Sequence, residues 1–276
     1  MKKICIYGKG GIGKSTVVSN VAAALASVGL KVAVVGCDPK ADSTRNLTKT
    51  NTDTVLNCIM RGEEHFYARG FMDVLCIESG GPEPGTGCAG RGIVAALTAI
   101  REKDLLADRD VVLFDVLGDV VCGGFSAPMR EKVADQVYLV TTDDYMALYA
   151  ANNICKGICK YAAFGDIRLS GVIRNGRSSV SEMGAAEAFA EAIGSNIIGS
   201  IPMDRAVSLA EIQRKTVIEA FPDSAIADAF RNLAQAMMST DGGVIPAPLS
   251  EDALENLYLE SARKREAAYD CEGSVS

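Results

Sequence analysis

Short apolar runs alternate with longer amphipathic stretches along most of the chain. The first apolar run covers residues 3–7. In the stretch after it, Val17, Val21 and Leu25 recur at the spacing of one helix face, and a second apolar run follows at 31–36. Apolar runs separated by helical stretches indicate repeated strand–helix units, in which helices cover a parallel sheet.

The same alternation continues to about residue 240. Further strands are expected at 74–77, 111–115, 137–141, 167–174 and 197–201. Helices are expected at 14–28, 92–103, 145–161, 182–193, 206–213 and 224–238. The pattern therefore predicts an α/β fold, with a mostly parallel sheet flanked by helices on both faces.

The segment after residue 240 has a different character. Two glycines and two prolines precede a charged stretch with helical spacing at about 250–268, and a polar end follows. No linker or internal repeat interrupts the preceding residues. We therefore expect a single domain at residues 1–240 and a C-terminal extension with a charged helix at residues 241–276, packed on the domain or on a partner.

The composition is that of a globular protein. The chain has 276 residues, of which 48% are hydrophobic and 23% charged, which excludes a disordered or collagen-like chain. Its 28 basic and 35 acidic residues give a net charge of −7, which argues against nucleic acid and anionic membrane surfaces as partners. The start has no apolar signal segment, and no run of about 18 apolar residues occurs, so a cytoplasmic location without a membrane span is expected.

Nine cysteines and a single histidine limit the metal chemistry of the chain. The odd cysteine count and the reducing compartment argue against a disulfide framework, and the lone histidine argues against a His-based zinc site. No C-x-x-C pair occurs, so most of the cysteines are expected to pack in the core. Those in apolar strands or on one helix are Cys5, Cys76, Cys155 and Cys159.

A complete phosphate-binding pattern follows the first predicted strand. Residues 8–15, GKGGIGKS, match G-x-x-x-x-G-K-[ST] between a strand and a helix. The glycines let backbone N–H groups surround the phosphates, Lys14 would reach the β- and γ-phosphates, and Ser15 would complete a Mg²⁺ shell. The predicted nucleotide-binding residues of this loop are Gly8, Lys9, Gly10, Gly11, Ile12, Gly13, Lys14 and Ser15. The domain is therefore predicted to be a P-loop NTPase.

The lysine early in this loop adds a second feature. With Lys9, the loop resembles the deviant Walker A family, whose members close as dimers around nucleotide. The resemblance implies a homodimer in which Lys9 reaches the partner's phosphates, much as an arginine finger acts in trans.

Four aspartates complete the predicted ATPase site. Asp38 and Asp115 each follow or end an apolar strand, at the edge where open α/β sheets bind ligands. Asp42 and Asp119 lie four residues after them. A turn or helix-cap role is the alternative for each one singly, but their joint placement after a phosphate loop favours catalytic and magnesium-binding roles.

Cys88 and Cys122 lie in glycine-rich surroundings. Residues 78–92 have the sequence ESGGPEPGTGCAGRG, and residues 115–125 have the sequence DVLGDVVCGGF. Glycine allows close backbone approach and brings N–H groups within reach of cluster sulfides. A [4Fe–4S] cluster needs four thiolates, so a symmetric dimer could hold one on its two-fold axis, with core packing as the alternative for either cysteine alone.

These segments together resemble the nitrogenase iron protein (dinitrogenase reductase) family, including its nitrogenase-like members. The matching segments are 7–15, 36–45, 78–92, 115–125 and 149–153, and the resemblance extends to about residue 240. It implies that Cys88 and Cys122 hold one [4Fe–4S] cluster between two identical subunits and that each subunit binds MgATP. It also implies that single low-potential electrons pass to a separate catalytic protein, with a ferredoxin or flavodoxin as donor. By the same resemblance, Arg91 matches an arginine that some nitrogen-fixing organisms ADP-ribosylate, and Asn175 matches a residue near the adenine.

The spacing within one segment suggests how nucleotide and cluster communicate. Asp115 and Cys122 are seven residues apart. A loop that moves when the γ-phosphate leaves would therefore displace the cluster ligand. The sequence predicts an ATP-hydrolysing oxidoreductase component in which nucleotide gates electron transfer.

The stretch at 46–75 bears on the identity of the catalytic partner. In the family it lies on the docking face, and here it is shorter than in the nitrogenase members. On this ground we favour a nitrogenase-like partner, for example a methylthio-alkane reductase or a nickel-tetrapyrrole reductive cyclase. The alternative is the iron protein of a true nitrogenase with ordinary loop variation. An alternative of another class is a partitioning-type ATPase switch, which would have no use for Cys88 and Cys122.

Overall fold

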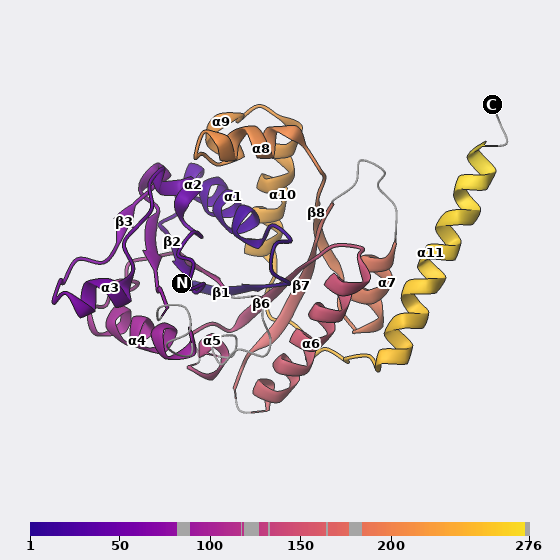
Figure 1. The fold of residues 1–276 in the computed structure, drawn as a ribbon, viewed down its shortest axis with the longest axis horizontal. Helices are drawn as coiled ribbons and strands as arrows, with labels where there is room; N and C mark the ends of the chain where they lie inside the picture. The colour runs from indigo at the N-terminus through magenta and orange to yellow at the C-terminus, as the bar shows by residue number, and fades with distance from the viewer. Residues whose placement is uncertain are drawn as a thin grey trace.

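The computed structural model describes residues 1–81, 89–116, 118, 127–131, 133–163, 165–176 and 184–273. In these residues eight strands form one sheet in the order β3-β4-β2-β5-β1-β6-β7-β8, parallel except for the β3–β4 pair (Figure 1). Their bounds are β1 Lys2–Tyr7, β2 Val32–Gly36, β3 Ala68–Arg69, β4 Leu75–Glu78, β5 Val111–Asp115, β6 Gln136–Thr141, β7 Arg168–Asn175 and β8 Ile197–Ile201. The seven predicted strands are all present, and the edge strand β3 is the one that was not predicted.

Helices cover both faces of this sheet. The longer ones are α1 Lys14–Ser27, α4 Ala89–Glu102, α6 Tyr145–Ala162, α7 Ala185–Ala192, α8 Arg205–Ile212, α10 Ala225–Ser239 and α11 Glu251–Gly273. The short ones are α2 Arg45–Thr48, α3 Val55–Met60, α5 Ala127–Arg130, α9 Val217–Ala220 and the 3₁₀ turn η1 Phe71–Asp73. The predicted helices are confirmed within a few residues at each end, and the short ones were not predicted because one turn carries no measurable periodicity.

The apolar core lies in two layers, one on each face of the sheet. Alternate residues of β1 enter different layers: Ile4 and Ile6 pack with α1 and α10, whereas Cys5 and Tyr7 pack with α4, α6 and α7. Figure 1 shows the corresponding arrangement, with α1 and α10 on one side of the strands and α4 and α6 on the other. Burial on both faces explains why the strands have continuous apolar sequences, and the predicted α/β architecture is confirmed.

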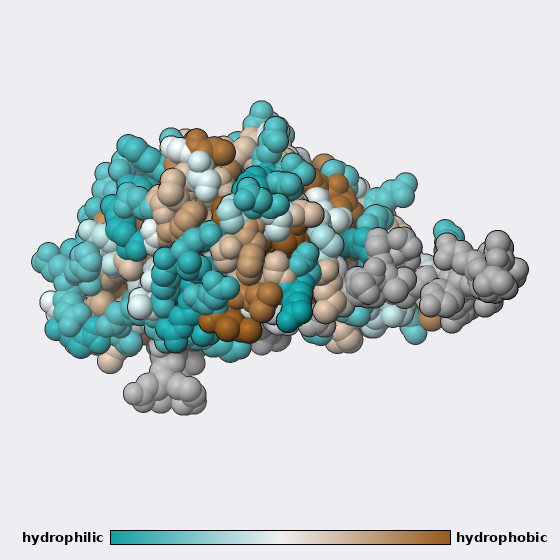
Figure 2. Space-filling model, turned by 90° about the horizontal axis from the view of Figure 1, so that it is seen from above, coloured by the Kyte–Doolittle hydropathy of each residue, from teal (hydrophilic) through white to brown (hydrophobic). Residues whose placement is uncertain are grey.

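The outer surface differs from this core. Figure 2 shows hydrophilic residues interspersed with smaller hydrophobic patches over one face of the molecule. Among the helices in the described part of the chain, none has both the length and the apolar character needed to cross a bilayer.

The segment after α10 returns along the domain before it forms α11. Val244 and Leu169 exchange two backbone hydrogen bonds of 2.9 Å, and the amide of Asn152 bonds both the carbonyl and the N–H of Leu249 at 2.9 and 2.8 Å. Leu254 is fully buried, which fixes the first turns of α11 beside α6 and α7. The rest of α11 extends away from these helices (Figure 1). The division into a domain and an extension at residue 240 stays a prediction.

The first strand is tied to the end of α10 by Lys2. Its Nζ donates hydrogen bonds to the carbonyls of Met238 and Thr240 at 2.6 and 2.7 Å, and its charge lies 3.4 Å from Asp241. The last carbonyls of a helix lack partners within the helix, and a cation there also interacts favourably with the helix dipole.

Lys2→Met should therefore lower the free energy of unfolding by about 1–2 kcal/mol, because it removes this cap and keeps the aliphatic stem. Chemical denaturation of the nucleotide-free protein would measure the change. Lys103→Met is the control, since its ion pair with Glu64 is long, 3.5 Å, and exposed. That pair should contribute less than about 0.5 kcal/mol. Equal losses in the two variants would contradict the capping role of Lys2.

Candidate functional site

The phosphate loop connects β1 to α1 and ends in an uncapped helix start. Gly13, directly before α1, has φ +90°, and a Cβ at this position would lie 2.5 Å from the side-chain nitrogen of Asn175. Both the backbone conformation and the close contact therefore require glycine. Gly13 provides no side chain to cap α1, and the first turn has no acidic residue. The first N–H groups of α1 are thus open to an anion such as a phosphate.

This loop lines a cavity of about 710 Å³ together with residues from the carboxyl edge of the sheet. The cavity brings together the predicted residues Lys9, Gly10, Gly11, Gly13, Lys14, Ser15, Asp38 and Asp42. Sequence reasoning missed the other lining residues, which are Thr16, Lys40, Ser43, Arg45, Asn46, Gly118 and Glu211. Several of them follow Asp38 in the loop after β2, so the end of that strand was the usable signal. Glu211 comes from α8 and accepts a 2.7 Å hydrogen bond from Thr16, a pairing that only the fold brings about.

Two buried residues of opposite charge lie close together at the site: Lys14, which lines the cavity, and Asp115, which is not among its lining residues. Lys14 is 8% exposed and Asp115 is 2% exposed. Burial raises the pKa of the Asp115 carboxyl, while the charge of Lys14 and the hydroxyls of Ser15 and Ser43 lower it. Asp115 is thus close to both the lysine and the serine expected at the γ-phosphate and the magnesium ion. This donor set, a hydroxyl with carboxylates beside an anion cradle, fits MgATP.

Asp38 and Lys9 have simpler surroundings. The Asp38 side chain accepts a 2.9 Å hydrogen bond from the backbone N–H of Lys40, so it forms a turn as well as facing the cavity. Lys9 is partly exposed, and its carbonyl is 3.5 Å from the amine of Lys14. A role for Lys9 across a dimer stays a prediction.

A second cavity, of about 430 Å³, continues from the phosphate loop on its other side. The side chain of Asn175 lines it and donates a 2.5 Å hydrogen bond to the carbonyl of Ile12, which braces the loop. Residues after β8 complete the wall: Pro202, Met203, Asp204 and Arg205. These four were missed, although they too follow the carboxyl end of a strand. A base and ribose attached to the phosphates would extend into this space, which supports the expected place of Asn175.

The two predicted cluster ligands, Cys88 and Cys122, lie outside the described residues, as do Asp119 and the side chain of Arg91. The described residue Gly118 belongs to the same segment as Cys122. A Cβ at Gly118 would overlap the carbonyl oxygen of Gly8 and lie 2.7 Å from the N of Gly10. The backbone at Gly118, four residues before Cys122 in the sequence, therefore packs directly on the phosphate loop.

The cysteines that the structure places are unsuited to bind a cluster. Six of them are free thiols: Cys5, Cys37, Cys58, Cys76, Cys155 and Cys159. Burial raises the pKa of each of these thiols, in Cys76 to about 12. Iron–sulfur clusters bind thiolates, so these protonated thiols, five of them buried and Cys159 partly exposed, are poor cluster ligands. The packing expected for Cys5, Cys76 and Cys155 is confirmed, and Cys159 donates to the carbonyl of Pro246 at 3.0 Å.

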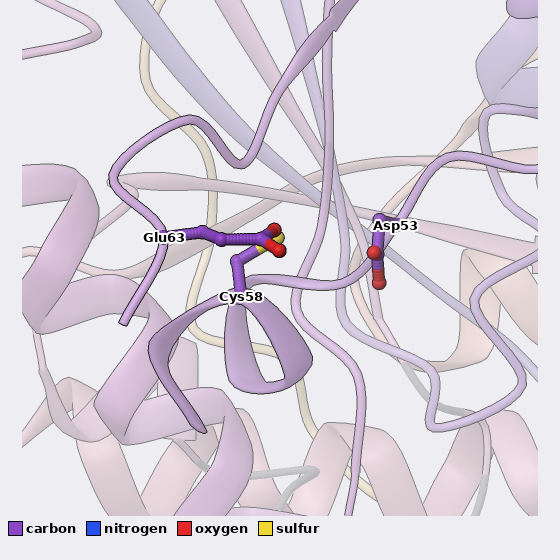
Figure 3. A group of neighbouring side chains, drawn as sticks. All are labelled: Asp53, Cys58 and Glu63. Atoms are coloured by element: carbon purple, nitrogen blue, oxygen red, sulfur yellow. The ribbon is translucent and has the colours of Figure 1, made fainter. Parts of the chain in front are cut away.

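A separate group of possible metal ligands lies around α3 (Figure 3). Asp53 precedes this helix, Cys58 is on it, and Glu63 follows it. The positive charge of Arg61 pairs with both carboxylates of this group. Its guanidinium donates two 2.8 Å hydrogen bonds to Glu63 and a further one to Asp53. Arg61 also holds the pKa of both carboxyls below the usual range. The arginine already supplies the positive charge, so the group is an ion-pair network that shapes the loop after α3.

The sequence matches the family of 4Fe-4S iron sulfur cluster binding proteins, NifH/frxC family, over residues 2–264. The chain belongs to the NifH/frxC family. It is 52% identical to a nitrogenase iron protein of Methanococcus voltae over 266 residues, which covers 93% of this chain and 95% of that protein. It is 47% identical to nitrogenase iron protein 2 of Methanobacterium ivanovii, with 93% and 98% covered.

The fold of this NifH/frxC member also resembles solved structures of other P-loop ATPases. The cell division ATPase MinD of Pyrococcus furiosus superimposes with a TM-score of 0.68 at 22% identity, covering 86% of this chain and 98% of that one. A ParA family ATPase of Chlorobium tepidum gives a TM-score of 0.63 at 20% identity, with 85% and 98% covered. These similarities show the fold alone, and they confirm the predicted P-loop NTPase architecture.

The family match decides most of the functional predictions. The predicted family, the ATP-hydrolysing reductase class, and the [4Fe–4S] cluster and MgATP as cofactors are confirmed. The preference for a nitrogenase-like partner is not supported, because the similar proteins named here are nitrogenase iron proteins. They favour the alternative stated above. The shorter stretch at 46–75 is therefore weaker ground for choosing the partner than the overall similarity. The individual site residues stay predictions.

Proposed function

We propose that this protein is the iron protein of a nitrogenase: a homodimer that passes single electrons to a separate catalytic component and couples each transfer to MgATP hydrolysis. The observation that carries the proposal is the packing of Gly118 on the phosphate loop, in a chain of the NifH/frxC family. This contact joins the nucleotide site to the segment of Cys122. The bound cluster supplies one-electron chemistry at low potential.

The residues of the nucleotide site perform the gating. Lys14 and the N–H groups of α1 bind the phosphates, and Ser15 with Asp115 holds the magnesium ion and its water. When the γ-phosphate leaves, the phosphate loop changes its conformation, and the backbone at Gly118, which packs on this loop, moves with it. Because Cys122 follows Gly118 by only four residues, such a shift would displace this cysteine, which would hold the cluster.

The docking surface for the catalytic component is proposed to include α3. Thr54, directly before this helix, forms an isolated parallel β-bridge with Glu78. The N–H of Leu56 donates a 3.3 Å hydrogen bond to the carbonyl of Ser79. The helix thus begins beside the segment that leads to Cys88. Ile59 and Met60 on α3 are 45% and 78% exposed. Exposed apolar side chains next to an ionic network are suited to a transient protein interface.

Two measurements on the anaerobically purified protein test this function. Iron and acid-labile sulfide should each amount to about four per dimer. Mixed with the catalytic component of a methanogen nitrogenase, a reductant and MgATP, the protein should support ammonia formation from N₂, and omission of MgATP should abolish it. If no ammonia forms although the cluster is complete and ATP is hydrolysed, the protein instead serves a nitrogenase-like catalytic partner. Absence of iron would leave only a nucleotide switch of the partitioning type.

A further inference from the structure

A buried carboxyl that the ATPase mechanism does not use lies beside the nucleotide site. Glu78, the last residue of β4, is fully buried. Its Oε1 accepts two hydrogen bonds from Thr44, one from the backbone N–H and one from the hydroxyl, both 2.7 Å long. Thr44 lies at the end of the loop that carries Asp38 and Asp42 into the nucleotide cavity. Glu78 therefore fixes one end of that loop to the sheet.

The other carboxylate oxygen of Glu78, Oε2, lies in an energetically unfavourable environment. Within the described residues, Oε2 has no hydrogen-bond partner, and a Cβ at Gly36 would overlap it, so only glycine leaves room opposite. Burial raises the pKa of Glu78 to about 7, although the two donors of Thr44 lower it. A buried carboxyl is less favourable than an apolar side chain of similar size. Its two bonds to Thr44 are the interaction that explains its presence.

The residues after Glu78 make a second contact with the same loop. A Cβ at Gly81 would lie 2.6 Å from the Cβ of Pro39, so the backbone at Gly81 lies against that proline. On its other side this backbone meets α4, where a Cβ at Gly92 would lie 3.1 Å from the carbonyl oxygen of Gly80. Gly80 and Gly81 are thus enclosed between the nucleotide loop and the first turns of α4.

These contacts lie on either side, in sequence, of one predicted cluster ligand. Cys88 lies in the sequence between Gly81 and Gly92. The residues before it, Gly80 and Gly81, contact Gly92 after it, and Gly81 also contacts Pro39 of the nucleotide loop. A displacement of residues 38–44 cannot leave this packed arrangement unchanged, because interiors at this density transmit strain.

We propose that Glu78 is a positioning residue that couples the nucleotide loop at residues 38–44 to the segment carrying Cys88. The proposal rests on the function proposed above and deepens it. Nucleotide state reaches the two cluster ligands by separate routes: through Gly118 to Cys122, and through Glu78 and Gly81 to Cys88. Each subunit thereby moves both of its ligands together.

Three variants and a control test this coupling. Glu78→Ala removes the acceptor for Thr44, Glu78→Gln keeps an acceptor oxygen in the same place, and Thr44→Val removes the hydroxyl donor while keeping the shape. Asn152→Ala is the matched control, since Asn152 is 1% exposed and also bonds a backbone N–H and a carbonyl, far along the chain at Leu249. The readouts are MgATP affinity, iron per dimer, and the rate at which an iron chelator removes the cluster iron with and without MgATP.

In the wild-type protein, the rate of iron removal with MgATP should differ from the rate without it, so that the ratio of the two rates is not one. Glu78→Ala should reduce that ratio by about fivefold or more toward one, with iron content retained, and Thr44→Val should reduce it in part. Glu78→Gln and Asn152→Ala should keep the wild-type ratio. If Glu78→Ala does not fold, a Thr44→Val protein with full iron and an unchanged ratio would overturn the proposal, as would an unchanged ratio in Glu78→Ala. A wild-type protein that lacks iron would instead refute the proposed function.

Discussion

Glutamine in place of Lys14 should lower the rate of MgATP hydrolysis by about a thousandfold, the loss typical of a removed transition-state charge contact. Lys14 is the first residue of α1, only 8% exposed, and close enough to Asp115 to lower the pKa of that carboxyl. We therefore expect its ammonium group to lie where negative charge develops on the transferred phosphoryl group. Glutamine has a similar length but no charge, so the site would keep its shape and lose the electrostatic stabilisation.

Phosphate release at saturating MgATP measures this effect, and iron per dimer should be unchanged because Lys14 is remote in sequence from both predicted cluster ligands. Lys40→Gln is the matched control. Lys40 lines the same cavity but is exposed, so its charge is screened by water and its loss should alter the rate by less than about tenfold. Equal losses in the two variants would mean that the cavity needs positive charge in general and that Lys14 has no special position.

The sheet and its covering helices could be predicted because burial on both faces leaves a simple mark in the sequence. Every residue of β5, Val111–Asp115, is buried, and an apolar run ending in aspartate is recognisable without any knowledge of its neighbours. The edge strand β3 left no such mark. It has two residues and pairs antiparallel with β4, so its existence depends on a tertiary contact rather than on a local pattern.

The same distinction separates the site residues that could be predicted from those that could not. The phosphate loop is continuous in sequence, and Asp38 follows a strand end, so spacing and position were sufficient. Glu78 also ends an apolar strand, but its partner Thr44 is 34 residues earlier. Nothing in the sequence distinguishes a carboxyl that hydrogen-bonds inside the protein from one that faces water. The preference for a nitrogenase-like partner found no support for a related reason, since the length of one stretch says little about which protein it binds.

The cysteines show how burial separates packing from chemistry. Burial raises the pKa of the thiols of Cys5, Cys76 and Cys155, so these thiols stay protonated and are poor metal ligands. The sequence around Cys88 and Cys122 offers glycine and backbone N–H groups instead. Of the nine cysteines, these two are therefore the ones predicted to bind the cluster iron.

Cys88→Ser should remove essentially all of the cluster iron from the dimer. One cluster bridging two subunits needs four thiolates, and this change takes away two of them at once, because each subunit carries the substitution. A serine hydroxyl does not ionise near neutral pH and is a poor substitute for a thiolate. MgATP binding should persist, since the phosphate loop joins β1 to α1 and Asp115 ends β5, and none of these elements carries the substitution.

Iron and acid-labile sulfide per dimer, measured beside MgATP affinity, would check this result. Cys159→Ser is the matched control, because Cys159 is partly exposed and its thiol donates to the carbonyl of Pro246, a bond that a serine hydroxyl can keep. That variant should retain about four irons per dimer. A Cys88→Ser protein with undiminished iron would show that the cluster has other ligands, and the coupling routes through Gly118 and Glu78 would then lead to no redox centre. Iron lost from Cys88→Ser alone, with nucleotide binding intact in both variants, would place the cluster where the two routes meet.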